Sequence, residues 1–344
     1  MTPLLEVNNL SIVYESKDEP NVEAVRDVSF TIDHGENLGL VGESGCGKTT
    51  AAASIIRNLP PNGTIISGEI IFDGTDITHL SKKELQKLRW KEISMISQSA
   101  MASLNPVYTI NEQIREAIQA HENGISDKEA RERGEELFDL VGIDPDRITD
   151  YPHQLSGGMR QRAIIAMALV HNPKLIIADE PTTALDVIVQ EQILHRVNEL
   201  QEEINSSMLM ITHDISVVAE TCDKVAVMYG GELMEVGTTD QIYNNSHHPY
   251  MLGLQNAFPS IEDEKQDLIS IPGFPPDLSN PPTGCPFAAR CPWSAVACEQ
   301  PLPEVEVEDG HRVMCHEPTP FERIRETADE KERWHAQRKE VIDQ

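Results

Sequence analysis

The sequence predicts an α/β fold around a sheet of parallel strands, and three patterns support this prediction. Continuous apolar runs at Leu175–Ala178 and Met208–Thr212 are typical of parallel strands that are buried on both faces. A short apolar strand, Asn37–Val41, leads into a glycine-rich loop, and a helix is expected next over Thr49–Asn58. Alternating apolar and polar residues between positions 4 and 33 predict half-buried antiparallel strands beside this core.

The middle of the chain carries helical spacing instead. Helices are predicted at Glu112–Gln119 and Asp127–Val141, with Ser126 and Asp127 as candidate caps of the second. We therefore expect a helical subdomain over about residues 99–160 within the sheet-based domain.

Two further strands, Lys224–Tyr229 and Glu232–Val236, are expected to pair through a glycine turn and to close the first domain. Beyond them the chain becomes rich in proline and cysteine and ends in a charged segment with a predicted helix near Phe321–Lys339. We place the domain boundary near residue 246, which gives domains 1–246 and 247–344.

The composition excludes some classes of protein. The 344 residues include 57 acidic and 28 basic side chains, for a net charge of −29. This balance argues against a nucleic-acid partner, because phosphate contacts need clustered Lys and Arg, and it favours a salt-rich cytoplasm over an ordinary acidic protein. No signal peptide and no apolar run of membrane-spanning length is visible. In a cytoplasm, the cysteines are expected as ligands or thiols rather than disulfides.

The glycine-rich loop at 42–49 matches the motif G-x-x-x-x-G-K-[ST], whose backbone N–H groups cradle the phosphates of a nucleotide. Lys48 is expected to reach the β- and γ-phosphates of ATP, and the Thr49 hydroxyl is expected to bind Mg²⁺. The expected nucleotide-binding residues of this segment are Gly42, Glu43, Ser44, Gly45, Cys46, Gly47, Lys48, Thr49 and Thr50.

A buried strand ends in two carboxylates, Asp179 and Glu180. Asp179 is expected to complete the Mg²⁺ site with Thr49. Glu180 is a candidate general base that polarises the water attacking ATP.

The segment Leu155-Ser156-Gly157-Gly158 resembles the signature motif of the ATPase subunits of ABC transporters. Ser156 can cap a helix whose free N–H groups form an anion site. In that family the motif faces the γ-phosphate held by the opposite subunit, so the resemblance implies an ATP molecule shared between two chains. It assigns this action in trans to Ser156, Gly157, Gly158 and Gln161.

The same resemblance implies further roles. Gln98 corresponds to the glutamine that contacts Mg²⁺ and the attacking water, and His213 to the histidine that contacts the γ-phosphate. Asp186 corresponds to the aspartate at the dimer interface, and Tyr14 to an aromatic residue that stacks on adenine. With Glu180, the catalytic candidates are Gln98 and His213. Together these features imply the ABC form of the P-loop NTPase fold: a RecA-like core, an antiparallel β subdomain and a helical subdomain.

Other segments resemble the oligopeptide and dipeptide importers of this family. They are Ser103–Pro106, Met159–Arg162, His248-Pro249-Tyr250 and the stretch from Gly273 to Cys291. The resemblance covers about residues 4–320 and implies that the chain drives peptide uptake. Importers of nickel and of oligosaccharides share much of the pattern and stay open as alternatives. A soluble ABC ATPase is a more remote alternative, because the chain shows one cassette and no coiled-coil repeat.

Four cysteines follow the spacing C-x5-C-x6-C-x16-C, namely Cys285, Cys291, Cys298 and Cys315. Members of the resembled family with this pattern hold a [4Fe-4S] cluster, and four thiolates are the number that one cluster needs. A zinc ion or metal-free thiols remain alternatives, although the C-x2-C of common zinc sites is missing.

The resemblance also implies partners and a location. We expect a second, related ATPase subunit in a heterodimer, two membrane permease subunits and an extracytoplasmic solute-binding protein. The chain itself is expected at the cytoplasmic face of the membrane, held there by the permeases.

Overall fold

The structure is a computed structural model that describes residues 2–97, 103–122, 124–181, 197–199, 201, 204–257 and 271–316. It divides into two compact units. The first takes Met1–Leu5, Thr31–Asn37 and Ile71–Ile211, and the second takes Glu6–Phe30, Leu38–Ile70 and Thr212–Gln344. Within the described residues, no helix is both long and apolar enough to cross a lipid bilayer.

The first unit contains three parallel strands, with β7 between β6 and β8. Every residue of β7 and β8 is buried. This burial explains why their sequences are apolar throughout instead of alternating. The bounds are β6 Ile93–Ile96, β7 Leu175–Asp179 and β8 Ser207–Thr212, so the predicted pair of buried strands is confirmed.

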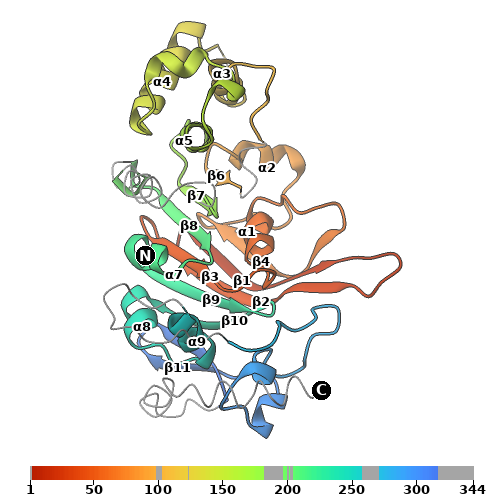
Figure 1. Ribbon diagram of the computed structural model, residues 1–344. Coiled ribbons are helices and arrows are strands. Elements are labelled where there is room, and N and C mark those ends of the chain that lie inside the picture. The colour runs from red at the N-terminus through yellow and green to blue at the C-terminus, as the bar shows by residue number, and fades with distance from the viewer. Residues whose placement is uncertain are drawn as a thin grey trace. The chain divides into compact units, whose positions relative to one another are not determined.

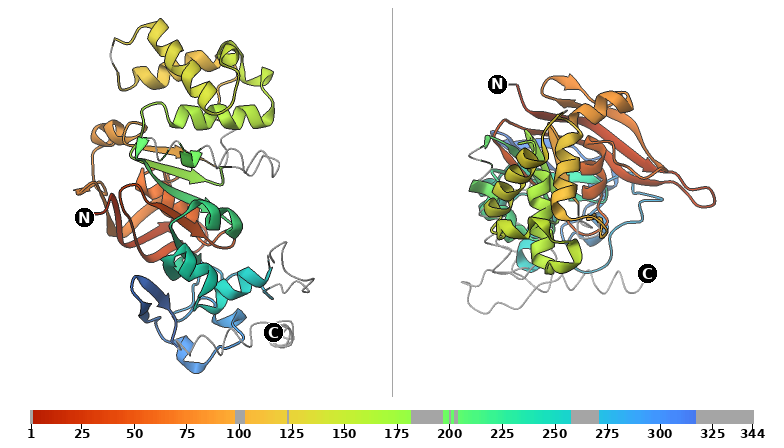
Figure 2. Two further views of the ribbon diagram at one scale, coloured as in Figure 1. Left: turned by 90° about the vertical axis from the view of Figure 1, so that its left-hand side faces the viewer. Right: turned by 90° about the horizontal axis from the view of Figure 1, so that it is seen from above.

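The helices α3, α4 and α5 gather in the same unit and form the predicted helical subdomain (Figures 1 and 2). Thr109 and Ser126 each begin a helix with a capping box, in which a glutamate three residues later returns the hydrogen bond. The cap predicted at Ser126 is thus confirmed. The bounds are α2 Lys82–Leu88, α3 Ile110–Gln119, α4 Asp127–Leu140 and α5 Gly157–Ala168, with short 3₁₀ turns at Pro145–Thr149 and Pro152–Gln154.

In the second unit, β1 lies between β2 and β4, and its apolar residues are buried while the polar residues between them are half-buried or exposed. The half-buried strand that the alternating sequence predicted is therefore confirmed. The bounds are β1 Leu5–Tyr14, β2 Val22–Ile32 and β4 Gly63–Phe72. The last two residues of β4 belong to the first unit and pair there with the short β5, Thr75–Asp76.

The second unit also holds β3 beside β9 in parallel, followed by β10, β12 and β11 in antiparallel order. The last two strands form a hairpin near the carboxyl end of the described chain, which the sequence analysis did not expect. The strands are β3 Asn37–Val41, β9 Lys224–Tyr229, β10 Glu232–Thr238, β11 Glu304–Glu308 and β12 His311–Met314. The helices are α1 Lys48–Ile55, α7 Ile215–Thr221, α8 Thr239–Asn244 and α9 Pro249–Ala257, with 3₁₀ turns at Ala288–Arg290 and Val296–Glu299.

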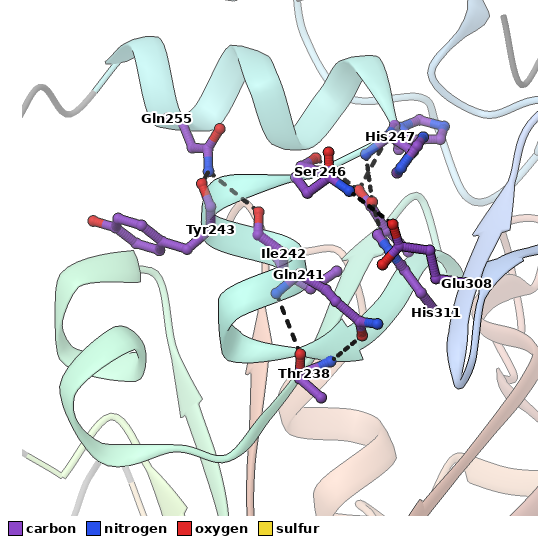
Figure 3. A network of polar contacts seen from close by, with 12 residues as sticks. Thr238, Gln241, Ile242, Tyr243, Ser246, His247, Gln255, Glu308 and His311 are labelled. Atoms are coloured by element: carbon purple, nitrogen blue, oxygen red, sulfur yellow. Dashed lines mark hydrogen bonds and ion pairs between the residues drawn. The ribbon is translucent and has the colours of Figure 1, made fainter. Parts of the chain in front are cut away.

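This pairing ties the chain after residue 246 to the strands before it. Glu235 on β10 receives hydrogen bonds from Ser246 and from His311 on β12, part of the polar network in Figure 3. The boundary near residue 246 stays a prediction, and the helix expected at Phe321–Lys339 lies outside the described residues.

Candidate functional site

The glycine-rich loop lies between β3 and α1, as the motif requires. Gly42 has φ +149° and Gly47 has φ +104°, in the region that side chains avoid. A Cβ at Gly42 would lie 2.0 Å from the Met228 carbonyl oxygen, and one at Gly47 would lie 2.2 Å from the Ala24 carbonyl oxygen. The loop thus needs glycine both for its turn and for the close approach of neighbouring backbone.

Lys48, the first residue of α1, is buried and folds back on the loop. Its ammonium group donates to the carbonyl oxygens of Gly42 at 2.7 Å and Glu43 at 2.8 Å. It also lies 3.5 Å from the thiol sulfur of Cys46. Cys46 was expected to contribute only its backbone to the phosphate loop. Its side chain also contacts Lys48. Burial raises the pKa of that thiol, and Lys48 partly offsets the effect.

Tyr14, at the end of β1, approaches the same loop. Its hydroxyl lies 2.9 Å from the hydroxyl of Thr50, the third residue of α1. The structure therefore brings together the aromatic residue predicted to stack on adenine and the helix predicted to start the phosphate site. The stacking itself stays a prediction.

Glu43 has two partners that sequence reasoning did not find. Its backbone N–H donates to the hydroxyl of Tyr250 at 2.8 Å, and its carboxylate accepts two hydrogen bonds from Arg290 at 2.7 and 3.0 Å. Tyr250 belongs to the His-Pro-Tyr segment and Arg290 precedes Cys291, so both stood in recognised motifs. No local pattern linked them to a loop more than 200 residues earlier in the chain.

The predicted metal and base carboxylates lie in the first unit. Asp179 ends β7, is 1 % exposed and pairs in register with Ile211 of β8. Glu180 follows with φ +47°, and its N–H donates to the Ile211 carbonyl oxygen at 2.8 Å. The strand pairing therefore fixes the backbone of both residues at the carboxyl end of the parallel strands.

Ser156 is the cap of α5, since its hydroxyl accepts a hydrogen bond from the Met159 N–H at 3.3 Å. Gly157 and Gly158 form the first turn of this helix, where backbone N–H groups have no partner within the helix. Gln161, one turn further, is buried and donates to the carbonyl oxygen of Pro181. The structure thus connects the signature helix to the residue directly after Glu180.

Gln98 and Asp186 lie outside the described residues. His213 follows β8 directly and is exposed.

The four predicted cysteines line one pocket of the second unit, together with His248, Phe287 and Trp293. Two of them are tied by backbone, because the Cys285 N–H donates to the Cys298 carbonyl oxygen at 2.8 Å. Burial raises the pKa of the Cys285 thiol to about 12 and that of Cys291 well above its ordinary value, so both are neutral thiols without a metal. Cys222, outside this group, is buried directly after α7.

The sequence matches two known families. Residues 25–183 match the family described as ABC transporter, and residues 234–298 match the family described as oligopeptide/dipeptide transporter, C-terminal region. The first match includes the phosphate loop, and the second includes Cys285, Cys291 and Cys298 but ends before Cys315.

Several curated proteins are similar over most of their length. The oligopeptide transport ATP-binding protein OppD of Bacillus subtilis is 48% identical over 91% of this chain and 88% of its own. The dipeptide transport ATP-binding protein DppD of Lactococcus lactis is 47% identical over 90% of this chain and 89% of its own.

Solved structures share the fold. A dimer of the ATP-binding cassette MJ0796 bound to ADP and phosphate is 29% identical with a TM-score of 0.62, and the match covers 68% of this chain and 98% of that one. CbiO1 from Clostridium perfringens, part of an ABC transporter complex, is 27% identical with a TM-score of 0.61 over 73% of this chain and 94% of its own. The fold is therefore that of the P-loop NTPases of ABC type.

Proposed function

This chain belongs to the ATP-binding subunits of ABC transporters, in the oligopeptide and dipeptide branch, and we propose that it powers the import of short peptides. The observation that carries this proposal is the 48% identity to an oligopeptide transport protein over 91% of the chain. The chain is an ATPase, and ATP with Mg²⁺ fits its family.

We assign the chemistry to residues of this chain as follows. The loop N–H groups and Lys48 bind the phosphates, and Tyr14 stacks on adenine. Thr49, Asp179 and Gln98 supply the oxygen ligands that Mg²⁺ prefers, and the ion neutralises charge on the phosphates. Glu180 polarises the attacking water, and His213 contacts the γ-phosphate.

The signature residues act on the nucleotide of the opposite subunit. In this proposal Ser156, Gly157, Gly158 and Gln161 face the γ-phosphate held by a second ATPase chain, and Asp186 lies at the dimer interface. The free N–H groups at the start of α5 support this assignment, because a helix N-terminus attracts anions. Closure of the dimer around ATP then drives two membrane permeases, which receive peptide from a solute-binding protein. The subunit works at the cytoplasmic face of the membrane.

A [4Fe-4S] cluster is part of this proposal. All four cysteines border one pocket, which supports a shared ligand. A single zinc ion would need sulfur atoms about 3.8 Å apart, from Zn–S bonds of about 2.3 Å. Within the described ranges, no three His, Cys, Asp or Glu side chains are grouped closely enough to hold one metal ion. Four thiolates are the number that one [4Fe-4S] cluster needs, and all four candidates border the same pocket.

The function is tested in proteoliposomes that hold the complete transporter. Labelled di- and tripeptides, nickel and an oligosaccharide are offered in turn, and uptake and ATP hydrolysis are measured for wild type and Glu180→Gln. We expect peptide uptake with wild type, and a closed, ATP-bound dimer with little turnover for the variant. Uptake of nickel or sugar in place of peptide would refute the substrate, and normal hydrolysis by Glu180→Gln would refute Glu180 as the base.

The cluster is tested by anaerobic purification with iron, sulfide and zinc assays and a visible spectrum. We expect about four iron atoms per chain and their loss in Cys291→Ser. Cys222→Ser is the matched control, because Cys222 is a buried cysteine outside the pocket, and it should keep the iron. One zinc per chain, or no metal, would refute the cluster.

A further inference from the structure

Glu43 of the glycine-rich loop is held by residues far along the chain, at its main chain and at its side chain. Tyr250 accepts a hydrogen bond from the Glu43 N–H at 2.8 Å, and Arg290 donates two to the Glu43 carboxylate. The same residue's carbonyl oxygen accepts from Lys48 at 2.8 Å. The position of Glu43 therefore sets one end of the loop that binds the phosphates.

Arg290 is held rigidly, so it can fix the position of the Glu43 carboxylate. It is 5 % exposed, and each of its five N–H groups has an acceptor. Besides the two carboxylate oxygens of Glu43, these acceptors are the hydroxyl of Tyr229 and the carbonyl oxygens of Ile271 and Pro272. A guanidinium group whose N–H donors are all hydrogen-bonded is fixed in one orientation.

The aromatic residues behind this pair are equally fixed. Tyr229, Tyr250 and Phe287 are fully buried, with ring centroids between 4.6 and 5.3 Å apart. The support for the loop is therefore a packed part of the second unit and not a surface contact.

The pairing has an electrostatic consequence for an anionic ligand. A carboxylate in the phosphate loop repels the triphosphate, and a bidentate arginine both neutralises it and fixes its direction. An unpaired Glu43 would leave that repulsion in place and would let the loop adopt conformations that ATP must then order.

We propose that Arg290 is a positioning residue for nucleotide binding, which acts on ATP through Glu43 and does not touch the ligand. This inference deepens the proposed function, since it requires that the glycine-rich loop binds ATP. It assigns a role in the nucleotide site to a residue of the cysteine-bearing segment.

The test measures ATP affinity of the isolated full-length chain, with Mg²⁺, for Arg290→Met, Arg290→Lys, Glu43→Gln and the double variant Glu43→Gln/Arg290→Met. Arg290→Met should weaken affinity roughly tenfold, a usual size for coupling between two sites. The ATP affinity of Arg290→Lys should lie between those of wild type and Arg290→Met, because lysine supplies the charge without the bidentate geometry of the guanidinium group. The double variant should return to within about threefold of wild type, because it removes the carboxylate together with its partner.

Arg312→Met is the matched control, since Arg312 pairs with Glu304 and the Ser29 carbonyl oxygen in the same unit. It should bind ATP like wild type. Melting temperature and iron content are recorded for every variant, and in the complete transporter the loss should appear in KM for ATP more than in kcat.

Two results would overturn the inference: wild-type affinity in Arg290→Met, or a double variant as weak as Arg290→Met, which would mark a purely structural role. If Arg290→Met does not fold, the comparison of Arg290→Lys alone with Arg290→Lys/Glu43→Gln decides in the same way. A wild-type chain that binds no ATP would instead refute the proposed function, so the two failures are distinguishable.

Discussion

The carboxylate of Glu235 on β10 accepts a hydrogen bond from the imidazole of His311 on β12 at 2.8 Å, and both side chains are completely buried. The Ser246 hydroxyl and the backbone N–H groups of His247 and His248 also donate to it. Figure 3 labels Ser246, His247 and His311 of this network. Four donors around one carboxylate compensate for its removal from water. This network fastens the hairpin near residue 310 to the strand pair before residue 246.

We expect Glu235→Gln to destabilise the protein by about 3 kcal/mol, because the amide offers one acceptor oxygen and places two N–H groups against donors. Urea denaturation of wild type and variant at pH 7 measures the loss. Glu304→Gln is the control: Glu304 is an exposed glutamate of the same hairpin, and the change should cost under about 0.5 kcal/mol. Equal costs for the two variants would contradict a structural role of the network.

Two serine helix caps allow an effect on stability to be distinguished from an effect on ATP hydrolysis. Ser156 caps α5 and Ser126 caps α4 in the same way, each accepting from the N–H three residues on. Ser156→Ala and Ser126→Ala should each cost about 1 kcal/mol of stability. Only Ser156→Ala should reduce ATP hydrolysis by the assembled transporter, by roughly tenfold or more. Similar hydrolysis by the two variants would show that Ser156 serves its helix alone.

Sequence patterns predict those features whose determining interactions are local. The glycine loop, the apolar strands β7 and β8 and the cap at Ser126 follow from residues within a few positions of one another. Their burial and hydrogen bonds depend on the period of the pattern and on short-range geometry, which the sequence displays directly.

Sequence patterns do not reveal contacts whose partner is distant along the chain. Glu235 lies within a predicted strand, and its hydrogen-bond donors lie 11 to 76 residues later in the chain. Arg290 and Glu43 are 247 residues apart. A charged residue is buried only when the tertiary structure supplies hydrogen-bond partners for it. The hydrophobic pattern of a segment does not show which distant residues those partners are. The hairpin β11–β12 was missed for the same reason, since its alternating glutamates give a strand pattern without showing which sheet it joins.

Acid should weaken the wild-type protein partly through His248. Burial lowers the pKa of this imidazole to about 3, and its Nδ1 accepts a hydrogen bond from the Tyr250 N–H, which requires the neutral ring. The unfolded chain takes up a proton near pH 6.5 and the folded chain does not, so this contribution to stability is present above pH 6.5 and decreases as pH falls toward 3. Between pH 7 and 5 the loss from this residue is about 2 kcal/mol.

His248→Asn removes this titration and keeps an acceptor at the start of α9. Urea midpoints of wild type and variant, measured from pH 7 to pH 5, should diverge, with the variant losing less stability. Parallel pH profiles would show that His248 does not contribute to acid sensitivity.

The aromatic ring and the hydroxyl group of Tyr14 have separate roles that substitutions can distinguish. Its ring is proposed to stack on adenine, and its hydroxyl contacts Thr50 at 2.9 Å. Stacking of a base on an aromatic ring contributes about 1–3 kcal/mol, so Tyr14→Ala should weaken ATP binding by roughly tenfold or more. Tyr14→Phe and Tyr14→Trp keep an aromatic face and should bind within about threefold of wild type. Calorimetric titration of the full-length chain with Mg-ATP measures all three. If Tyr14→Phe loses as much affinity as Tyr14→Ala, the hydroxyl contact to Thr50 and not the ring is what the nucleotide requires.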